Sequence, residues 1–233
     1  MKKIIFIIVL LSEQLISNAQ ITQGRIVVGT SIFYQNQQTI NYDPVGNRNG
    51  AQTTYNNFTY TLQPGYLITE NFCLGISAVY INNTENNQNP PDPEFDSDSK
   101  TWLYGIYGRH YLYISEKFYF TNSFVMTLKT GTNNSSNYYT DPSLNTSSAL
   151  GIKGYYFSYA PGLLYFITPH VGIKTNIGTI SYDHTTTTTT SGSNTGTSNT
   201  YGIFSILSPL TSFNVGVDFF FGKIGNEPKS DVR

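Results

Sequence analysis

Alternation of apolar and polar residues at every second position is the feature that most constrains the fold of this chain. Between Phe58 and Ile68 the even-numbered positions are apolar or aromatic, and most odd-numbered positions are polar or glycine. The same period recurs in the segments 119–129, 171–178 and 213–221. A period of two is typical of strands with two unlike faces. Apolar residues at helical spacing form no convincing pattern, so the sequence predicts an all-β protein.

A short repeated pattern predicts how the strands connect. The segments 67–72, 113–118 and 166–171 each join an apolar strand end to an apolar restart through two or three polar residues. Long polar stretches lie between these tight turns, at 35–57, 82–100, 130–153 and 183–201. We predict an antiparallel up-and-down barrel of eight strands, at about 24–35, 57–69, 72–82, 101–114, 118–130, 154–168, 171–182 and 206–221. Its weakest points are Pro64, Pro161 and Pro209, because a proline removes a ladder hydrogen bond.

Periodicity alone does not tell which face of such a barrel points inward. A soluble, lipocalin-like barrel buries its apolar face, whereas a membrane barrel turns that face to lipid. The apolar face here carries bulky aromatics such as Phe58, Tyr60 and Tyr66, and the alternate face carries small or polar residues. Only 12% of the residues are charged, about half of the usual share in a soluble domain. These features favour a transmembrane β-barrel, with short periplasmic turns and long extracellular loops.

The N-terminus predicts export from the cytoplasm. Lys2 and Lys3 precede the apolar run Ile4–Leu11, and a small-residue site follows at 17–19. This is the pattern of a cleavable signal peptide, and the apolar run is too short to span a bilayer. We predict a signal peptide over residues 1–19, followed by a single barrel domain over 20–233. Since Cys73 is the only cysteine, an intrachain disulfide is excluded.

The end of the last strand carries the most specific resemblance in the chain. Asn214-x-Gly216-x-x-Phe219-x-Phe221 resembles the polar-x-Gly-x-x-aromatic-x-aromatic signal that outer-membrane barrels present to their assembly machinery. With the predicted topology, the mature chain resembles the small eight-stranded barrels of Gram-negative outer membranes, the OmpA/OmpX-like group. The resemblance implies an outer-membrane location, with membrane lipid and the assembly machinery as partners. The chain departs from the family pattern in continuing past the last aromatic, over residues 222–233.

Four charged residues are expected to face the lumen, namely Arg109, Lys129, Lys174 and Asp218. A charge on the lipid face near the midplane would cost about 2–4 kcal/mol, so the alternation has to turn them inward. They could set ion selectivity or form a plug of paired charges; an eight-stranded barrel leaves room only for side chains, which favours the plug. Lys174 and Asp218 fall at similar heights on sequential strands, so we predict a salt bridge between them that Arg109 joins.

No residue pattern points to catalysis or to a cofactor. His110, His170 and His184 lack metal-ligand spacing, and there is no nucleophile elbow. Two groups could be read as sites but are interpreted as solvated loops: the pair Asp183 and His184, and the acidic cluster Asp92, Glu94, Asp96 and Asp98. With 13 basic and 14 acidic residues, the chain also lacks the basic excess of a nucleic-acid-binding protein. We therefore predict no enzymatic activity, no cofactor, no metal and no nucleic-acid partner.

The functional expectation is correspondingly broad. We predict an outer-membrane β-barrel with a plugged polar lumen and exposed loops, in an envelope-structural or surface-interaction role through a loop-bound partner. The role itself is implied mostly by the resemblance. The alternative is a narrow, porin-like passive channel for small or apolar solutes.

Overall fold

Ten antiparallel strands and one short 3-10 helix make up the described part of the chain. The structure is a computed structural model that describes residues 21–40, 52–88, 94–139, 141–191, 194–207 and 215–222. The elements are β1 (Ile26–Ile40), β2 (Gln52–Leu67), β3 (Phe72–Gln88), β4 (Glu94–Ser115), β5 (Phe118–Tyr138), η1 (Pro142–Leu144), β6 (Thr146–Thr168), β7 (Val171–Asn176), β8 (Gly178–Ser191), β9 (Asn194–Leu207) and β10 (Val215–Phe221). The predicted signal peptide, Pro209, Asn214 and residues 223–233 lie outside the described residues. Among those described, no helix has the length and apolarity needed to cross a membrane.

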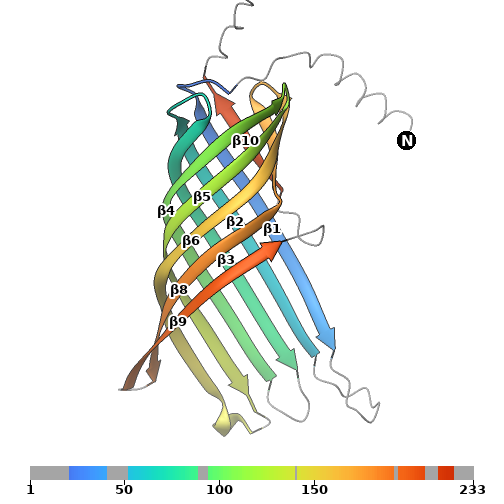
Figure 1. Cartoon of the computed structure of the whole chain (residues 1–233). Coiled ribbons are helices and arrows are strands. Elements are labelled where there is room, and N and C mark those ends of the chain that lie inside the picture. Colours follow the sequence, from blue (N-terminus) through green and yellow to red (C-terminus); the bar gives the residue numbers. More distant parts are fainter. Residues whose placement is uncertain are drawn as a thin grey trace, which may run out of the picture.

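Eight of these strands close into a ring, as predicted. Going round it, β1, β2, β3, β4, β5, β6, β7 and β10 are each hydrogen-bonded to the next, and β10 pairs back to β1. Every pairing is antiparallel, and the ribbon in Figure 1 shows the tilted strands wrapping round one axis. The short turns of β2–β3, β4–β5 and β6–β7 lie at the end where β1 begins and β10 ends. This is the short-turn end; the opposite end carries the long hairpins.

The predicted seventh and eighth strands need correction. The expected strand 171–182 is divided at Ile177 into β7 and β8, opposite Pro161 on β6. A proline has no N–H to donate to the neighbouring strand, and here the Ile177 N–H donates to the Pro161 carbonyl instead (2.9 Å). Of the predicted strand 206–221, only β10 pairs with β1 and β7, whereas residues 206 and 207 belong to β9.

Most of the predicted long loops are extensions of the strands. The segment 183–201, expected to be a mobile loop, forms most of the β8–β9 hairpin, with Thr185 paired to Thr200. Similarly, β3 continues to Gln88 and β4 begins at Glu94, inside the predicted loop 82–100. Threonine favours extended backbone and its hydroxyl can bond across strands, which explains why polar segments continue the sheet.

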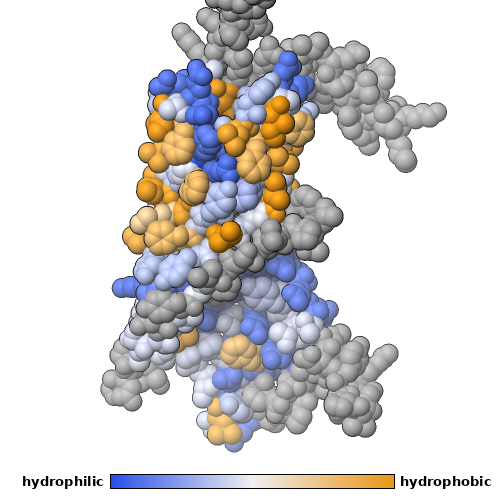
Figure 2. All heavy atoms as spheres, viewed as in Figure 1, coloured by the Kyte–Doolittle hydropathy of each residue, from blue (hydrophilic) through white to orange (hydrophobic). Residues whose placement is uncertain are grey.

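The side chains alternate between an apolar exterior and a polar interior, as predicted. Figure 2 shows apolar residues gathered over the half of the barrel nearer the short turns, and hydrophilic ones towards the long hairpins. On β4 the outward band runs from Trp102 to Ile114, a height of about 30 Å along a tilted strand. This matches the hydrocarbon core of a bilayer. The exposed apolar side chains of this band include Ile32, Tyr60, Leu62, Tyr66, Leu74, Ile76, Trp102, Tyr104, Ile106, Leu112, Phe124, Met126 and Phe219.

An apolar plug fills the interior at the short-turn end, which the sequence analysis did not anticipate. Its members come from the strand ends nearest the turns: Val27, Leu67, Cys73, Tyr107, Tyr111, Tyr119, Leu164, Phe166 and Phe220, with Ile21 beside them. Several of these side chains have no exposed surface at all. The expectation that bulky aromatics all face lipid is therefore wrong for this end, where the ring converges on a packed core.

Candidate functional site in the barrel lumen

A layer of charged side chains crosses the lumen directly above the apolar plug. Arg109 on β4 donates to Asp218 on β10 at 2.7 Å, and both side chains are almost completely buried. The same guanidinium donates to the Gln63 side-chain carbonyl (2.7 Å) and to the Ser123 hydroxyl (3.0 Å). β4 and β10 lie four strands apart in either direction round the ring. Arg109 therefore spans the full width of the lumen.

Lys174 on β7 completes this layer. Its ammonium lies 3.4 Å from Oδ1 of Asp218, so the predicted contact between these two residues is present. Asp218 thus accepts from two cations, one on each carboxylate oxygen. Because a buried ion is costly unless it is paired, Asp218 is the element that lets two positive side chains remain in the lumen.

Glycines on the neighbouring strands make room for the charged layer. Gly29 on β1 pairs with Asp218, and a Cβ added at Gly29 would lie 2.6 Å from Oδ1 of that carboxylate. Gly216 pairs with Lys174, and a Cβ there would lie 3.5 Å from Cε of the lysine. The positions beside the charged side chains are therefore the ones that carry no side chain of their own.

Lys129, the fourth predicted lumen charge, lies apart from this layer. It forms an ion pair with Asp183 on β8, and its ammonium also donates to the Thr185 hydroxyl at 2.9 Å. Asp183 was interpreted as part of a solvated loop; it lies instead in a strand, with its carboxylate turned to the lumen. The outward-facing His184 stacks on Tyr155 with ring centroids 4.6 Å apart, so these two neighbours point to opposite faces of the sheet.

A second set of contacts caps the plug at the short-turn end. Arg25 donates to the carbonyl oxygens of Pro169 (2.8 Å) and Phe220 (2.9 Å). Its guanidinium also lies 3.2 Å from Nδ1 of His170 and 5.3 Å from the centre of the Phe220 ring. These contacts join the beginning of β1 to the β6–β7 turn and to the end of β10. The lumen is thus closed by the cap, the apolar plug and the charged layer in succession.

A cavity of about 330 Å³ lies above the charged layer. Arg109, Gln63 and Lys174 form its floor, and Lys129 and Asp183 lie at its other end. Hydroxyl-bearing side chains form much of the wall, namely Ser31, Thr59, Thr61, Ser77, Ser123, Thr127, Tyr156, Ser158 and Thr179. Of the two ends of the lumen, only the short-turn end has the plug, so the cavity faces the long hairpins.

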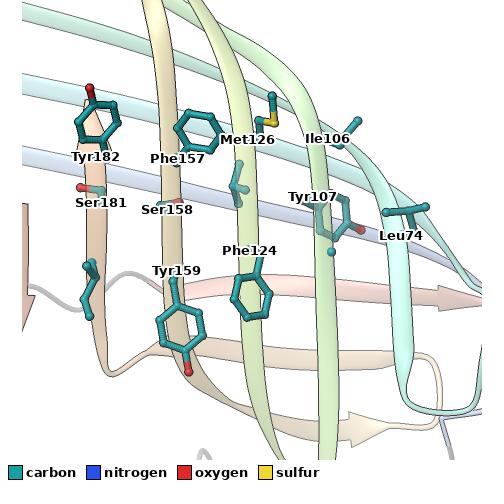
Figure 3. A pocket seen from close by; sticks show the side chains of 13 residues that line it. Leu74, Ile106, Tyr107, Phe124, Met126, Phe157, Ser158, Tyr159, Ser181 and Tyr182 are labelled. Carbon is teal, nitrogen blue, oxygen red and sulfur yellow. The ribbon is translucent and has the colours of Figure 1, made fainter. Parts of the chain in front are cut away.

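A larger apolar groove, of about 470 Å³, lies on the outer surface. Figure 3 shows Phe124 and Met126 of β5 beside Phe157 and Tyr159 of β6, with Tyr182 of β8 alongside. Several of these side chains are about half exposed. The groove belongs to the lipid-facing band, and lipid chains would fill it.

The other candidate groups lie apart. His110 is on β4 and His170 in the β6–β7 turn, far along the chain from His184. The acidic cluster of the second predicted loop lies on β4 where it is described: Asp98 pairs with Lys100 (2.7 Å), and Asp96 accepts from Asn86 (2.6 Å). Asp92 lies outside the described residues. Within the described part of the chain, no three His, Cys, Asp or Glu side chains come close enough to hold a metal ion.

The described residues of the assembly signal lie on β10. Gly216 is buried, and Phe219 and Phe221 point outward with ring centroids 6.5 Å apart. The aromatic pair therefore belongs to the lipid-facing surface at the short-turn end. Asn214, the polar residue of the pattern, is outside the described residues.

Sequence reasoning missed several residues of the lumen. Gln63 and Ser123 have the inward parity of their strands, so the alternation could have placed them beside Arg109. Asp183 continues the inward series of Thr179 and Ser181, but that series was ended at residue 182 because the polar run after it was interpreted as a loop. Arg25 precedes the alternating segment and left no periodic signal.

Comparisons with known proteins find similarity at the level of overall structure. No protein-family model matches the chain, and no curated protein sequence matches it significantly. Among solved structures, the chain is similar to the outer membrane protein OprG from Pseudomonas aeruginosa (13% identity, 89% of this chain and 100% of that one, TM-score 0.43). It is also similar to the outer membrane protein AlkL (13%, 88% and 93%, 0.45) and to Ail, the attachment invasion locus protein of Yersinia pestis (12%, 86% and 100%, 0.40). At these identities and scores the matches assign no role to this chain.

The closed ring, the apolar outer band and the polar lumen are the features of an outer-membrane β-barrel, as predicted. The resemblance to the small eight-stranded barrels holds at the level of this fold.

Proposed function

We propose that this protein is a sealed outer-membrane β-barrel that acts at the cell surface, in an envelope-structural or surface-interaction role, rather than as a pore. The single observation that carries the proposal is the closure of the lumen. Asp218 and Arg109 bridge its full width, and the apolar plug lies beneath them. A porin needs a continuous aqueous channel, and larger barrels leave one, whereas an eight-stranded barrel is narrow enough for side chains to fill.

The strands beyond the membrane band support action at the surface. On β4 the eight residues from Glu94 to Thr101 continue past the aromatic residue Trp102, which corresponds to about 20 Å of sheet outside the hydrocarbon. Side-chain hydrogen bonds link the outer faces of adjacent strands there, as from Asn36 to Asn56 and from Asn56 to Thr84. Such a wall presents many amides and hydroxyls in fixed positions, which suits contact with a polar partner.

In this proposal the signal peptide delivers the chain across the inner membrane, the assembly machinery reads the end of β10, and the protein has no catalytic role. The separation of His110, His170 and His184 supports the last point, because general base catalysis needs a nucleophile within hydrogen-bonding reach of the base.

Conductance in planar lipid bilayers tests the proposal. Purified, refolded barrel is expected to give no stable open-channel current at moderate voltage. The double variant Arg109→Ala with Asp218→Ala is the comparison, since it removes the charged layer and leaves the apolar plug in place. It should also stay closed. A steady single-channel current from the unaltered protein would overturn the sealed-barrel proposal and favour the narrow passive channel.

A further inference from the structure

We propose that the cavity above the charged layer is a binding site for a small organic monoanion, a carboxylate with a short, hydrogen-bonding body. This goes beyond the proposed surface role, because a sealed barrel needs no ligand in its lumen. The proposal stands on the balance of charge at the cavity, on the disposition of the donors and on the cavity's size.

The charged side chains at the cavity carry a net positive charge of one. Lys129 and Asp183 form a pair of their own at one end. At the floor, two cations, Arg109 and Lys174, share the single carboxylate of Asp218. A surplus positive charge in a confined, largely buried space is costly, and a bound monoanion would neutralise it.

Lys174 is the group that would receive the anion. Arg109 is occupied on three sides, by Asp218, Gln63 and Ser123, at 2.7–3.0 Å. Lys174 makes one long contact of 3.4 Å to Asp218, although an ammonium has three N–H donors. Its side chain lines the cavity and retains 11% exposure. Donors are therefore available there in the direction of the cavity.

The wall supplies hydrogen bonds for the rest of such a ligand. Thr127 is 2% exposed and lines the cavity, and its Oγ1 has no hydrogen-bond partner among the described residues. A buried hydroxyl without a partner is costly, and a ligand oxygen or nitrogen can satisfy it. Thr61, Ser77 and Ser158 add hydroxyls at other positions of the wall.

The volume limits the size of the ligand. About 330 Å³ is at the lower end of the range for small-molecule sites. The nearby apolar side chains, such as Val79, Leu103 and Val125, leave a polar floor under a mixed wall. A short hydroxy- or amino-substituted carboxylate fits this combination better than a polyanion, whose extra charges would find no further cations.

Isothermal titration of the refolded barrel in detergent micelles tests the proposal, with lactate as the probe. Lactamide is the neutral control ligand, and chloride tests for a simple halide site. Lactate is expected to bind and lactamide to bind at least about tenfold more weakly, because hydrogen bonds to charged groups carry most of the difference. Equal binding of the two, no binding of lactate, or saturation by chloride that lactate cannot displace would each overturn the carboxylate site.

Two variants locate the binding within the cavity. Lys174→Met removes the charge and should weaken lactate binding about tenfold or more, whereas Lys100→Met, in an exposed ion pair outside the lumen, should leave it unchanged. If Lys174→Met does not fold, as judged by its heat-shifted mobility on a gel, Thr127→Val takes its place, with an expected loss of about three- to tenfold. Unchanged affinity in the folded variant would overturn the assignment. Conductance of the same preparations keeps a failure of this site distinct from a failure of the sealed barrel.

Discussion

Arg109 and Asp218 meet at 2.7 Å across the lumen although 109 residues separate them in the chain. They come from β4 and β10, the strands that face each other in the closed ring. This contact can form only when the whole ring has closed, because neither residue can reach the other through neighbouring strands. The ion pair therefore reports on the completed barrel.

Replacing Asp218 with Asn is expected to destabilise the barrel strongly, because it leaves Arg109 and Lys174 buried without a counter-charge. Removing one partner of a buried ion pair costs about 3–5 kcal/mol. Urea unfolding of the protein in lipid vesicles, followed by tryptophan fluorescence, measures the change in free energy. Asp98→Asn is the matched control, since Asp98 pairs with Lys100 on the exposed part of β4. Equal effects of the two substitutions would contradict the structural role of the lumen pair.

Gly29→Ala should destabilise the barrel through a steric clash rather than a loss of charge. The new methyl group would lie 2.6 Å from Oδ1 of Asp218, and that carboxylate is held by Arg109 and Lys174. Overpacking of this kind costs about 1–3 kcal/mol. The control is Gly196→Ala on the β8–β9 hairpin, where an added Cβ has no neighbour within 4 Å. The same unfolding assay should separate the two variants, and a neutral Gly29→Ala would show that the carboxylate has room to move.

The lipid-facing band is tested by placing a charge in it. Ile106→Lys is expected to lower stability in vesicles by about 2–4 kcal/mol, because position 106 lies well inside the apolar band of β4. Thr132→Lys is exposed on β5 beyond that band and should have little effect. Similar stabilities of the two lysine variants would mean that the bilayer does not surround the band as described.

The last strand is tested by its outward aromatics. Phe219→Ser combined with Phe221→Ser should reduce the amount of folded barrel in the outer membrane, because both rings belong to the proposed assembly signal and to the lipid-side aromatics. Val215→Ser with Val217→Ser changes outward residues of the same strand that are not part of the signal. Folded protein is quantified by heat-modifiable gel mobility in membrane fractions. A similar loss in both double variants would show that apolarity alone, rather than the aromatic pattern, is needed.

Much of this architecture could be predicted from local sequence, because the period of two encodes both the strands and their faces. That period placed Arg109 and Lys174 in the lumen, and the sequential order of strands brought Lys174 to Asp218. Local pattern could not reveal where strands end, since β8 and β9 are built from threonine, serine and asparagine that also suit loops. Nor could it reveal the apolar plug: Phe166 and Phe220 have inward parity, but only the convergence of strand ends at the turns packs them together.

Sidedness of access to the lumen tests the sealed barrel most directly. In a Cys73→Ser background, Thr61→Cys places one thiol in the cavity above the charged layer. Glu70→Cys in the β2–β3 turn and Thr132→Cys on β5 mark the two ends of the barrel in proteoliposomes. A small anionic methanethiosulfonate reagent added outside the vesicles should modify Thr61→Cys in the same fraction of molecules as Thr132→Cys, and in the complement of the Glu70→Cys fraction. Complete modification of Thr61→Cys whatever the orientation of the barrel would contradict the seal.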